Sequence, residues 1–507
     1  MSPALFIIAI DYLSRSIANL FENQPNMNFR TRGGFLISHL CFADDLIIFM
    51  NASRNHIKKL MDFLSYFQSI SGLSLNNKKC FFYVHNNMKS DRILPIKEQT
   101  GFMHGVLPIK YLGTPLYKGR KRSFLFDDLI TFIQNKLHSW DSNFLSFGGR
   151  LTLIRSVLSS FPVYSFQTLL PTKLVCKRID IILNKFFWKG FGGNNKIIWA
   201  SWDKCCGVRA ERGLGCKTMA DLTHAFSYKL WFNFRANKSL WAKFMFSKYC
   251  FGKHHFLCVL KNGDSKVSRR MCKIKWDVEP HLSWGIGGDN IFFWQDQLLN
   301  SSSIDSFINS TSKSVEKVSN FITDNCWNYD KLADILPDCI IQKIINLPTI
   351  FDSKDMLLCK LSKDGLFSLK EAWHSFRLKK EVYFIYSKIW HKTIQSTISI
   401  FIWRLFHKII PTDDILRKRG IIKPSKCQCC FHSENMHHVF VFGPIAVKTW
   451  IYFEDVFKLN IYKTNMSIYG LLNSWFVNPI GHIRNVTYSL IFLVLVAGKE
   501  QLFVQWD

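Results

Sequence analysis

The stretch L-I-S-H-L-C-F-A-D-D-L-I-I-F-M, Leu36 to Met50, places two adjacent acids between two apolar runs. The runs predict two β-strands, and Ala43, Asp44 and Asp45 predict the tight turn that joins them, because Asp tolerates turn geometry. Two carboxylates roughly 4 Å apart repel each other by about 4 kcal/mol at an effective dielectric constant of 20. A divalent cation with oxygen ligands would offset this repulsion. The alternative is a solvated turn whose acids point into water.

The composition is that of a folded and strongly basic chain. Of the 507 residues, 48% are hydrophobic and 15% aromatic, a content that argues against disorder. The 66 Lys and Arg residues against 37 Asp and Glu residues give a net charge of +29. The length predicts two to four domains, and the charge indicates polyanionic partners, nucleic acid first and anionic membrane second.

The cysteine count and the apolar runs bear on the cellular compartment. Fifteen cysteines without regular spacing favour reduced thiols in an intracellular compartment, with a clustered subset available for metal. The first apolar run lacks a preceding cationic region and is interrupted by Asp11, so we expect no signal peptide. The longest apolar run, Leu490 to Ala497, is too short to span a bilayer. The sequence therefore predicts a soluble intracellular protein that does not bind a membrane.

Helical and strand patterns surround the acidic pair. Apolar residues at helical spacing predict one helix from Ser2 to about Phe21 and a second from about Ser53 to Ser71, which Gly72 ends. Leu107 to Leu116 predicts a short strand. The chain from Asp127 to about Phe234 predicts mostly helix and is rich in Lys, Arg and Trp.

Four blocks of the chain, in the same order, resemble the reverse transcriptases of LINE-type (non-LTR) retrotransposons, especially those of plants. The blocks are S-P-A-L-F-I-I-A-I-D-Y-L-S-R (Ser2 to Arg15), F-A-D-D (Phe42 to Asp45), S-G-L-S-L-N-N-K-K-C (Ser71 to Cys80) and L-P-I-K-Y-L-G-T-P-L (Leu107 to Leu116). Four ordered blocks are far more specific than one F-A-D-D alone. The resemblance implies an α+β fold: a truncated reverse transcriptase palm with an FADD β-hairpin, a helical thumb, and a mostly helical zinc-binding-like module.

The same resemblance implies RNA-templated DNA synthesis on a DNA primer, with deoxynucleotides as the small-molecule substrates. Two Mg²⁺ ions, held by Asp44, Asp45 and one further Asp on an upstream strand, would activate the 3′-oxygen and steady the leaving pyrophosphate. Lys79 would match the family's lysine near the nucleotide phosphates, and Asn76 the asparagine three residues before it. The alternative for this segment is a helix-ending glycine followed by solvated lysines. The family also implies a nuclear location.

Part of that machinery has no counterpart in this sequence. The only acids before Asp44 are Asp11 and Glu22, and Asp11 falls inside the first predicted helix. The glycine-rich turn that precedes this helix in the family, the fingers and an endonuclease domain are also missing. We therefore expect a fragment of a truncated or decayed element that cannot polymerise alone. The alternatives are a non-catalytic nucleic-acid-binding protein, which would use the basic thumb and the zinc-like module, and a membrane-surface protein.

The predicted helices after the palm could form a nucleic-acid surface. Leu145 to Leu158 and Ile179 to Trp188 resemble thumb helices of the family. The basic residues that could line a groove for the template–primer duplex are Arg150, Arg155, Lys173, Lys177 and Arg178. Phosphate contacts need only a positive face, so they imply no sequence specificity. An ordinary solvated helix surface is the alternative for each of these residues.

Two further segments lie between the thumb and the zinc-like module. W-G-I-G-G-D-N-I-F-F-W-Q-D, Trp284 to Asp296, resembles a linker block of plant LINE proteins and predicts a hairpin between aromatic strands. The Ser-rich stretch Ser301 to Ser319 predicts a flexible connector. The predicted order is a partial palm over 1–118, a thumb-like region over 119–235, a connector over 236–350, a zinc-binding-like domain over 351–455 and a C-terminal tail over 456–507.

The segment from Lys426 to Trp450 resembles the zinc-binding module that follows the reverse transcriptase in plant LINE proteins. That module has the pattern C-x2-C, seven or eight residues, then H-x4-C, and Cys427, Cys430 and His438 match its first three positions. Two thiolates and an imidazole nitrogen are ligands that suit a tetrahedral Zn²⁺ ion. The fourth position is Gly443, which has no side chain, so either the metal is lost or another residue substitutes. The candidates for substitution are Cys429, His432 and His437.

Overall fold

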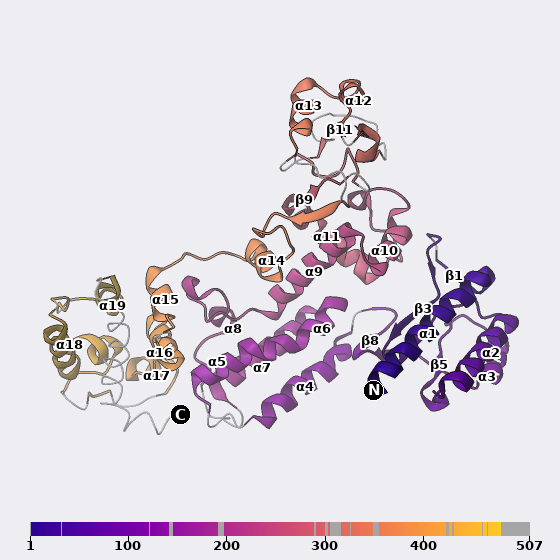
Figure 1. Cartoon of the computed structure of the whole chain (residues 1–507). Coiled ribbons are helices and arrows are strands. Elements are labelled where there is room, and N and C mark those ends of the chain that lie inside the picture. The colour runs from indigo at the N-terminus through magenta and orange to yellow at the C-terminus, as the bar shows by residue number, and fades with distance from the viewer. Residues whose placement is uncertain are drawn as a thin grey trace. The chain divides into compact units, whose positions relative to one another are not determined.

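The chain is divided into two compact units, each built from two separate stretches of sequence. The computed structural model describes residues 2–477 apart from 32, 121, 141–144, 191–196, 288–290, 300–302, 305–315, 325, 348–353, 393, 422–424, 428–429, 459 and 464. Unit 1 combines Met1–Lys121 with Ser227–Ser368, and unit 2 combines Arg122–Phe226 with Leu369–Asp507. The described residues form mostly helices with six two-stranded sheets (Figure 1), so the predicted α+β class is confirmed. The five-part domain order stays a prediction.

Two long helices frame the first part of unit 1. Helices α1 (Ser2–Asn23) and α2 (Arg54–Ser71) lie within two residues of the predicted bounds at both ends. The hydroxyl of Ser53 accepts a hydrogen bond from the backbone N–H of His56 and caps α2, while Gly72 ends it at φ +67°. A shared core holds these helices together, and its buried members are Leu13, Ile17, Phe21, Met27, Leu60, Leu64 and Phe67.

Short strands surround these helices, and one of them corrects a prediction. Residues 107–116 form a hairpin of β7 (Ile109–Tyr111) and β8 (Thr114–Leu116) instead of one strand. Leu112 and Gly113 turn the chain at φ +46° and +74°, and glycine adopts such angles without a steric cost. The other elements here are η1 (Pro25–Met27), β1 (Phe29–Arg30), β2 (Leu36–Ile37), β3 (His39–Phe42), β4 (Asp45–Ile48), η2 (Asn77–Lys79), β5 (Phe81–Phe82), α3 (Ser90–Thr100) and β6 (Met103–His104).

The second part of unit 1 corrects the predicted hairpin in Trp284 to Asp296. Strand β9 (Leu282–Gly285) pairs antiparallel with β12 (Met356–Cys359), and Phe292 bridges Lys317. The pairing partners are therefore distant in sequence, and residues 288–290 lie outside the described part. Most of the predicted connector 301–319 also lies outside it. The other elements are α10 (Leu240–Cys250), η6 (His255–Leu257), α11 (Lys266–Val278), η7 (Glu279–His281), η9 (Val318–Phe321), β10 (Ile322–Thr323), β11 (Cys326–Trp327), α12 (Tyr329–Ala333) and α13 (Asp338–Ile345).

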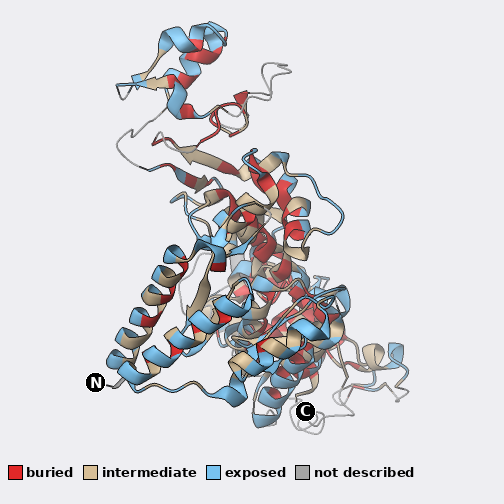
Figure 2. Ribbon diagram, turned by 90° about the vertical axis from the view of Figure 1, so that its right-hand side faces the viewer, coloured by how far each residue is buried: buried red, intermediate tan, exposed pale blue. Residues whose placement is uncertain are grey.

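Unit 2 is helical and has one extended hydrophobic core. Figure 2 colours the buried residues of the described chain red. The prediction that residues 127–234 are mostly helical is confirmed. Its first stretch contains η3 (Ser123–Phe126), α4 (Asp127–Ser139), α5 (Phe147–Ser156), η4 (Leu158–Ser160), α6 (Phe161–Thr168), α7 (Lys173–Lys189), α8 (Trp202–Cys205), η5 (Arg209–Glu211) and the start of α9 (Met219–Ala236). Its second contains α14 (Leu369–Phe376), α15 (Phe384–Ile389), α16 (Ser396–Phe406), α17 (Asp413–Lys418), η10 (His438–Phe442), α18 (Pro444–Phe457) and α19 (Ile468–Val477).

Helix α1 is unusual in how much apolar surface it exposes. Leu5, Ile7 and Ile8 are each more than 60% exposed. Within the described residues, Pro3–Asn23 is the one helix that is long and apolar enough to cross a membrane, judged by length and composition. Asp11 and Arg15 form an ion pair of 2.8 Å on this helix.

Candidate functional site

The acidic pair lies at the tip of a β-hairpin in unit 1. Strands β3 and β4 pair antiparallel, with Phe42 opposite Asp45. The turn therefore consists of Ala43 and Asp44, while Asp45 begins β4 and does not belong to the turn as predicted. Ala43 has φ +50°, a left-handed conformation that is uncommon for a residue with a Cβ atom. Such backbone strain is often found at functional sites.

The hairpin is held against the core, whereas its tip is exposed. Leu46 and Ile48 of β4 pack on the core shared by α1 and α2. Ser14 Oγ of α1 lies 2.7 Å from His39 Nε2 of β3, which ties the helix to the hairpin. Asp44 and Asp45 are exposed. The alternation of apolar residues thus positions two carboxylates in water at the end of a supported strand pair.

Among the described residues, no third carboxylate lies close enough to the acidic pair to complete a metal site. In the described part of the chain, the one group of three or more His, Cys, Asp or Glu side chains close enough for a single ion lies in unit 2. Asp11 lies in α1, as predicted, and is paired with Arg15. Mg²⁺ prefers near-octahedral oxygen coordination, and two carboxylates supply only part of it. The described residues therefore do not fit the three-acid, two-ion site that the resemblance implies.

The residues expected near the nucleotide phosphates are also exposed. Asn76 caps the 3₁₀-helix η2, and its side-chain oxygen accepts a hydrogen bond from the N–H of Lys78 at 3.1 Å. Lys79 ends that helix and is solvent-exposed. This geometry gives Asn76 a local structural role, and the nucleotide-binding role of both residues stays a prediction.

The five predicted basic groove residues lie in unit 2 and differ in their environment. Arg150 is buried, donates from Nη1 to the carbonyl of Phe187 at 3.4 Å, and stacks over a neighbouring aromatic ring. Arg178 is exposed but pairs with Asp127 at 2.9 Å. The remaining three, Arg155, Lys173 and Lys177, are exposed. Since a phosphate contact needs an accessible cation, Arg150 is poorly placed for one.

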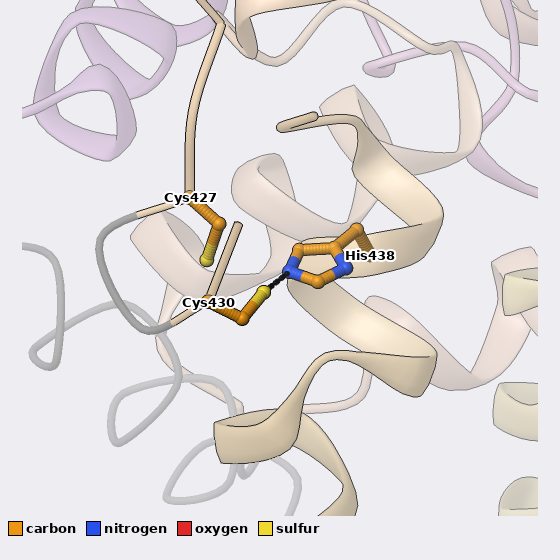
Figure 3. Close-up of side chains that lie close together, drawn as sticks. All are labelled: Cys427, Cys430 and His438. Carbon is orange, nitrogen blue, oxygen red and sulfur yellow. Dashed lines mark hydrogen bonds between the residues drawn. The ribbon is translucent and has the colours of Figure 1, made fainter. Parts of the chain in front are cut away.

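The predicted zinc ligands come together in unit 2. The ligand atoms of Cys427, Cys430 and His438 all lie within 4.8 Å of one another (Figure 3). Cys430 Sγ is 3.2 Å from His438 Nε2. The two cysteines lie in an irregular segment, and His438 begins the π-helix η10. Two thiols and one imidazole are the donor types of structural zinc sites, so these residues fit three of four positions.

Local hydrogen bonds position these three side chains. The N–H of Cys427 donates to the carbonyl of His432 at 2.9 Å, which holds Cys427 near the residues that follow Cys430. The N–H of His438 donates to Asn435 Oδ1, also at 2.9 Å. Cys427 and His438 are buried, with 8% and 3% of their surface exposed. These are the three residues that the sequence matched to the zinc-binding module, and zinc binding by them stays a prediction.

Gly443, at the expected fourth position, lies beside this cluster. A Cβ atom built on Gly443 would be 3.2 Å from His438 Nε2 but only 2.4 Å from the His438 carbonyl oxygen. A side chain here would therefore point toward the ligands and would also require the backbone to shift. Of the suggested substitutes, Cys429 lies outside the described residues. The rings of His432 and His438 stack at 5.8 Å between centroids.

Sequence reasoning missed a buried ionic network in unit 1. Arg235, 1% exposed, donates to Glu279 Oε1 at 2.7 Å and to Asp296. Asp296 Oδ1 also lies 3.1 Å from His254 Nε2 and accepts from Trp284 Nε1 at 3.0 Å. Burial alone would raise the pKa of Asp296, but the Arg235 guanidinium and the His254 ring hold it below its usual range. The sequence signal that could have revealed this network is the presence of isolated charged residues within runs rich in aromatic residues.

Two family models match separate parts of the chain. Residues 1–116 match the model described as reverse transcriptase (RNA-dependent DNA polymerase). Residues 367–450 match the model described as zinc-binding in reverse transcriptase. The first range contains the acidic hairpin, and the second contains Cys427, Cys430 and His438. The two matches therefore agree with the two clusters of candidate residues.

Curated relatives are found in Arabidopsis thaliana. One, named as a ribonuclease H protein, is 24% identical over 353 residues, which cover 66% of this chain and 57% of the relative. Another, named as an uncharacterised mitochondrial protein, is 30% identical over 54 residues, or 11% of this chain and 35% of the relative. The chain thus matches little more than half the length of the first. Residues 1–116 are thus similar to reverse transcriptases, and residues 367–450 are similar to a zinc-binding module found in reverse transcriptases.

Proposed function

We propose that this chain is part of a LINE-type RNA-directed DNA polymerase, the reverse transcriptase of a non-LTR retrotransposon. The observation that carries the proposal is the FADD hairpin, which presents Asp44 and Asp45 at a supported tip inside the segment similar to reverse transcriptases. The zinc-type cluster of Cys427, Cys430 and His438 in the second matched segment supports it independently. The net charge of +29 suits an RNA template and a DNA primer as partners.

The chain in its present form would be inactive as a polymerase. Phosphoryl transfer by this class of enzyme depends on metal ions that neutralise charge at the attacking and leaving oxygens. Asp44 and Asp45 would provide two of the carboxylates for such ions, and the described residues supply no third one at the hairpin. Asn76 and Lys79 would contact the incoming deoxynucleotide only if the ions were held. The proposed role is therefore that of a polymerase part that needs complementary segments.

A primer-extension assay tests the proposed inactivity. The purified chain is incubated with an RNA template, an annealed DNA primer, deoxynucleotides and Mg²⁺, next to the variants Asp44→Ala and Asp62→Ala. Asp62 is an exposed acid on α2 and is the matched control. We expect no template-dependent extension by any of the three. Extension that is lost in Asp44→Ala and retained in Asp62→Ala would overturn the inactivity and identify a working active site.

A non-catalytic nucleic-acid-binding role is the second candidate, and helix α7 favours it. Lys173 and Lys177 are exposed and lie one helical turn apart, so their ammonium groups follow the same face. Such a face can follow phosphates without reading sequence. Neither residue needs the acidic hairpin for this role. Binding would therefore persist in a chain that cannot polymerise.

Salt-dependent binding tests this second role. Each phosphate contact contributes about 0.9 to the slope of log K against log salt for duplex DNA. The double variant Lys173→Ala, Lys177→Ala should lower that slope by about 1.8 if both lysines contact phosphates. Replacing Lys58 and Lys97, two exposed lysines of unit 1, is the charge-matched control. Equal slopes for the two double variants would exclude α7 as the binding face.

A further inference from the structure

Three cysteines of unit 1 gather in a part of the chain that neither family model covers. Cys250 ends helix α10, Cys258 follows the 3₁₀-helix η6, and Cys272 lies in helix α11. Cys250 Sγ and Cys258 Sγ are 2.9 Å apart. Cys272 Sγ is oriented toward the carbonyl of Cys258, at 3.9 Å. All three are free thiols in this structure.

The sulfur atoms of Cys250 and Cys258 lie only slightly farther apart than bonded sulfurs. A disulfide has an S–S length of about 2.05 Å, so Cys250 and Cys258 need to approach by less than about 1 Å from their 2.9 Å separation. The tight turn after α10 produces this approach, because Phe251 and Gly252 adopt φ +50° and +80° and reverse the chain. The pair is therefore arranged by the fold before any oxidation occurs.

The surroundings distinguish the two thiols. The hydrogen bond with Cys250 lowers the pKa of Cys258, burial opposes that effect, and the Lys275 ammonium adds to the lowering. Lys275 is fixed nearby, since Nζ donates to the carbonyls of Phe256 at 2.8 Å and Cys258 at 3.1 Å. The pKa of Cys250 is raised by the same hydrogen bond and by burial. Cys258 is thus the thiol that ionises first.

Access also favours Cys258. Cys250 is 2% exposed, whereas Cys258 is partly exposed and lies between the exposed residues Leu257 and Val259. A small reagent in solution therefore reaches Cys258 more readily than Cys250. This order of access is that of an attacking and a resolving cysteine.

We propose that Cys250 and Cys258 form a reversible disulfide by exchange with a low-molecular-weight disulfide such as oxidised glutathione. The Cys258 thiolate attacks one glutathione sulfur, and the S–S bond breaks to release one glutathione thiolate. The Cys250 thiol then loses its proton to solvent and attacks the Cys258 sulfur, which releases the second glutathione. The two protein thiols are oxidised, the glutathione disulfide is reduced to two thiols, and the electrons balance. Reduced glutathione in excess reverses both steps.

Closing this bond would constrain the segment that supports the buried network. The closed loop contains His254, which lies against Asp296, and His255, whose Nδ1 is 3.4 Å from Arg235 Nη1. A crosslink lowers the chain entropy of the unfolded state and so stabilises the folded segment. The oxidised chain should unfold at a higher temperature than the reduced chain. The proposal does not depend on the polymerase assignment.

Peptide mapping of the full chain tests the proposal. Trypsin cleavage after Lys248, Lys253 and Lys261 places Cys250 and Cys258 on neighbouring peptides, while Cys272 lies on a third, Met271–Lys273. After treatment with oxidised glutathione and alkylation of the remaining thiols, we expect the first two peptides to be linked. The link should disappear on reduction with dithiothreitol. Cys272 should be recovered as the alkylated thiol.

Three single variants identify the role of each cysteine. Cys250→Ser should accumulate a glutathione adduct on Cys258, because the resolving thiol is missing. Cys258→Ser should leave Cys250 as a free thiol, and Cys272→Ser should retain the link. Circular dichroism confirms that each variant is folded. Recovery of both thiols alkylated in the treated wild-type chain, or a link between Cys258 and Cys272, would overturn the proposal.

Discussion

The hairpin tip of unit 1 and the cysteine–histidine cluster of unit 2 both carry metal-binding residue types, but they differ in their exposure to solvent. Asp44 and Asp45 are exposed and adjacent in sequence. Cys427, Cys430 and His438 are contributed by two separated segments, and two of them are buried. Among the residues that the structure describes, each group is one protein ligand short of the set that its resemblance implies. An incomplete ligand set has different physical consequences in the two places.

Solvation explains this difference. Water and salt screen two exposed carboxylates, so the hairpin can keep both acids without a metal ion at little cost. Thiols and an imidazole that converge in the interior give little stability until a metal binds them, and metal binding then contributes to folding. The acids should matter for chemistry and hardly for stability, whereas the cluster should matter for stability. Asp296 provides the reference case of a buried acid that an arginine, not a metal, compensates.

The largest expected effect is at that reference acid. Replacing Asp296 with Ala leaves the Arg235 guanidinium buried without one of its two carboxylate partners. Breaking a buried ion pair typically costs about 3–5 kcal/mol. We expect a loss of that size in the free energy of unfolding of unit 1, measured by urea denaturation. Asp334→Ala, at an exposed acid of the same unit, is the control and should change little; a similar effect of both variants would contradict the comparison.

Zinc binding by the unit 2 cluster should depend on each of its three donors. Losing a residue that only supports a metal ligand typically costs 10–100-fold in affinity, so losing the ligand itself in Cys430→Ser should cost at least about a hundredfold. Competition with a chromophoric chelator measures this change. Cys326→Ser removes an exposed cysteine from unit 1 and should leave the affinity unchanged. Unaltered zinc affinity in Cys430→Ser would show that the cluster is not the metal site.

Acidification should destabilise unit 1 through His255. Burial, and then the nearby Arg235 charge, hold the pKa of His255 well below 6.5 in the folded chain, so the unfolded chain binds the proton more readily. The stability that this neutral ring contributes is complete above about pH 6.5 and is lost as the pH falls. Between pH 7 and about pH 6.5 the stability hardly changes. From about pH 6.5 to pH 5 the loss should reach about 2 kcal/mol, at about 1.36 kcal/mol per pH unit.

Urea denaturation at the two pH values measures this loss, and His255→Phe is the test variant. The ring of His255 contacts those of Phe234 and Phe246, so an aromatic replacement retains the packing. The variant should show a smaller fall in stability between pH 7 and pH 5. An identical fall in both proteins would assign the pH dependence to other groups.

A ligand introduced at position 443 tests the comparison by adding a zinc donor to the cluster instead of removing one. Gly443→Cys places a thiol beside His438, and we expect tighter zinc binding by about tenfold or more, since a third thiolate provides the fourth ligand of the tetrahedral set. The gain in zinc affinity is limited because the new Cβ atom would lie 2.4 Å from the His438 carbonyl oxygen, so the backbone has to move. Gly443→Ser introduces nearly the same volume with a poorer zinc ligand. Equal affinities for the two variants would mean that position 443 does not reach the metal.

The smallest effect is expected at the hairpin tip. Replacing both Asp44 and Asp45 with Asn removes an exposed like-charge pair, and surface changes of this kind usually alter stability by no more than about 0.5 kcal/mol. Thermal unfolding, followed at two salt concentrations that differ about tenfold, measures the change in stability. A strong destabilisation would indicate that the acids hold the hairpin together, and the contrast with unit 2 would then fail.

Local signals in the sequence predicted the elements whose ends they define. Ser53 and Gly72 delimit α2 because a capping hydroxyl and a left-handed glycine act on the residues beside them. The spacing of Cys427, Cys430 and His438 likewise predicted a cluster, since a Cys-x-x-Cys turn brings its two thiols together locally. The pairing of β9 with β12 could not be predicted in the same way, because it joins strands about seventy residues apart.

By itself, the sequence determined the α+β class and the two helices around the acidic hairpin, and it indicated which carboxylates and thiols are candidates for metal binding. The tertiary structure alone decided that Arg150 is buried, that Arg235 is neutralised by Glu279 and Asp296, and that Cys250 meets Cys258. The physical reason is the distance along the chain over which each effect acts. Caps, turns and periodic apolar faces act over a few residues, whereas burial and charge compensation depend on neighbours that only the folded chain brings together.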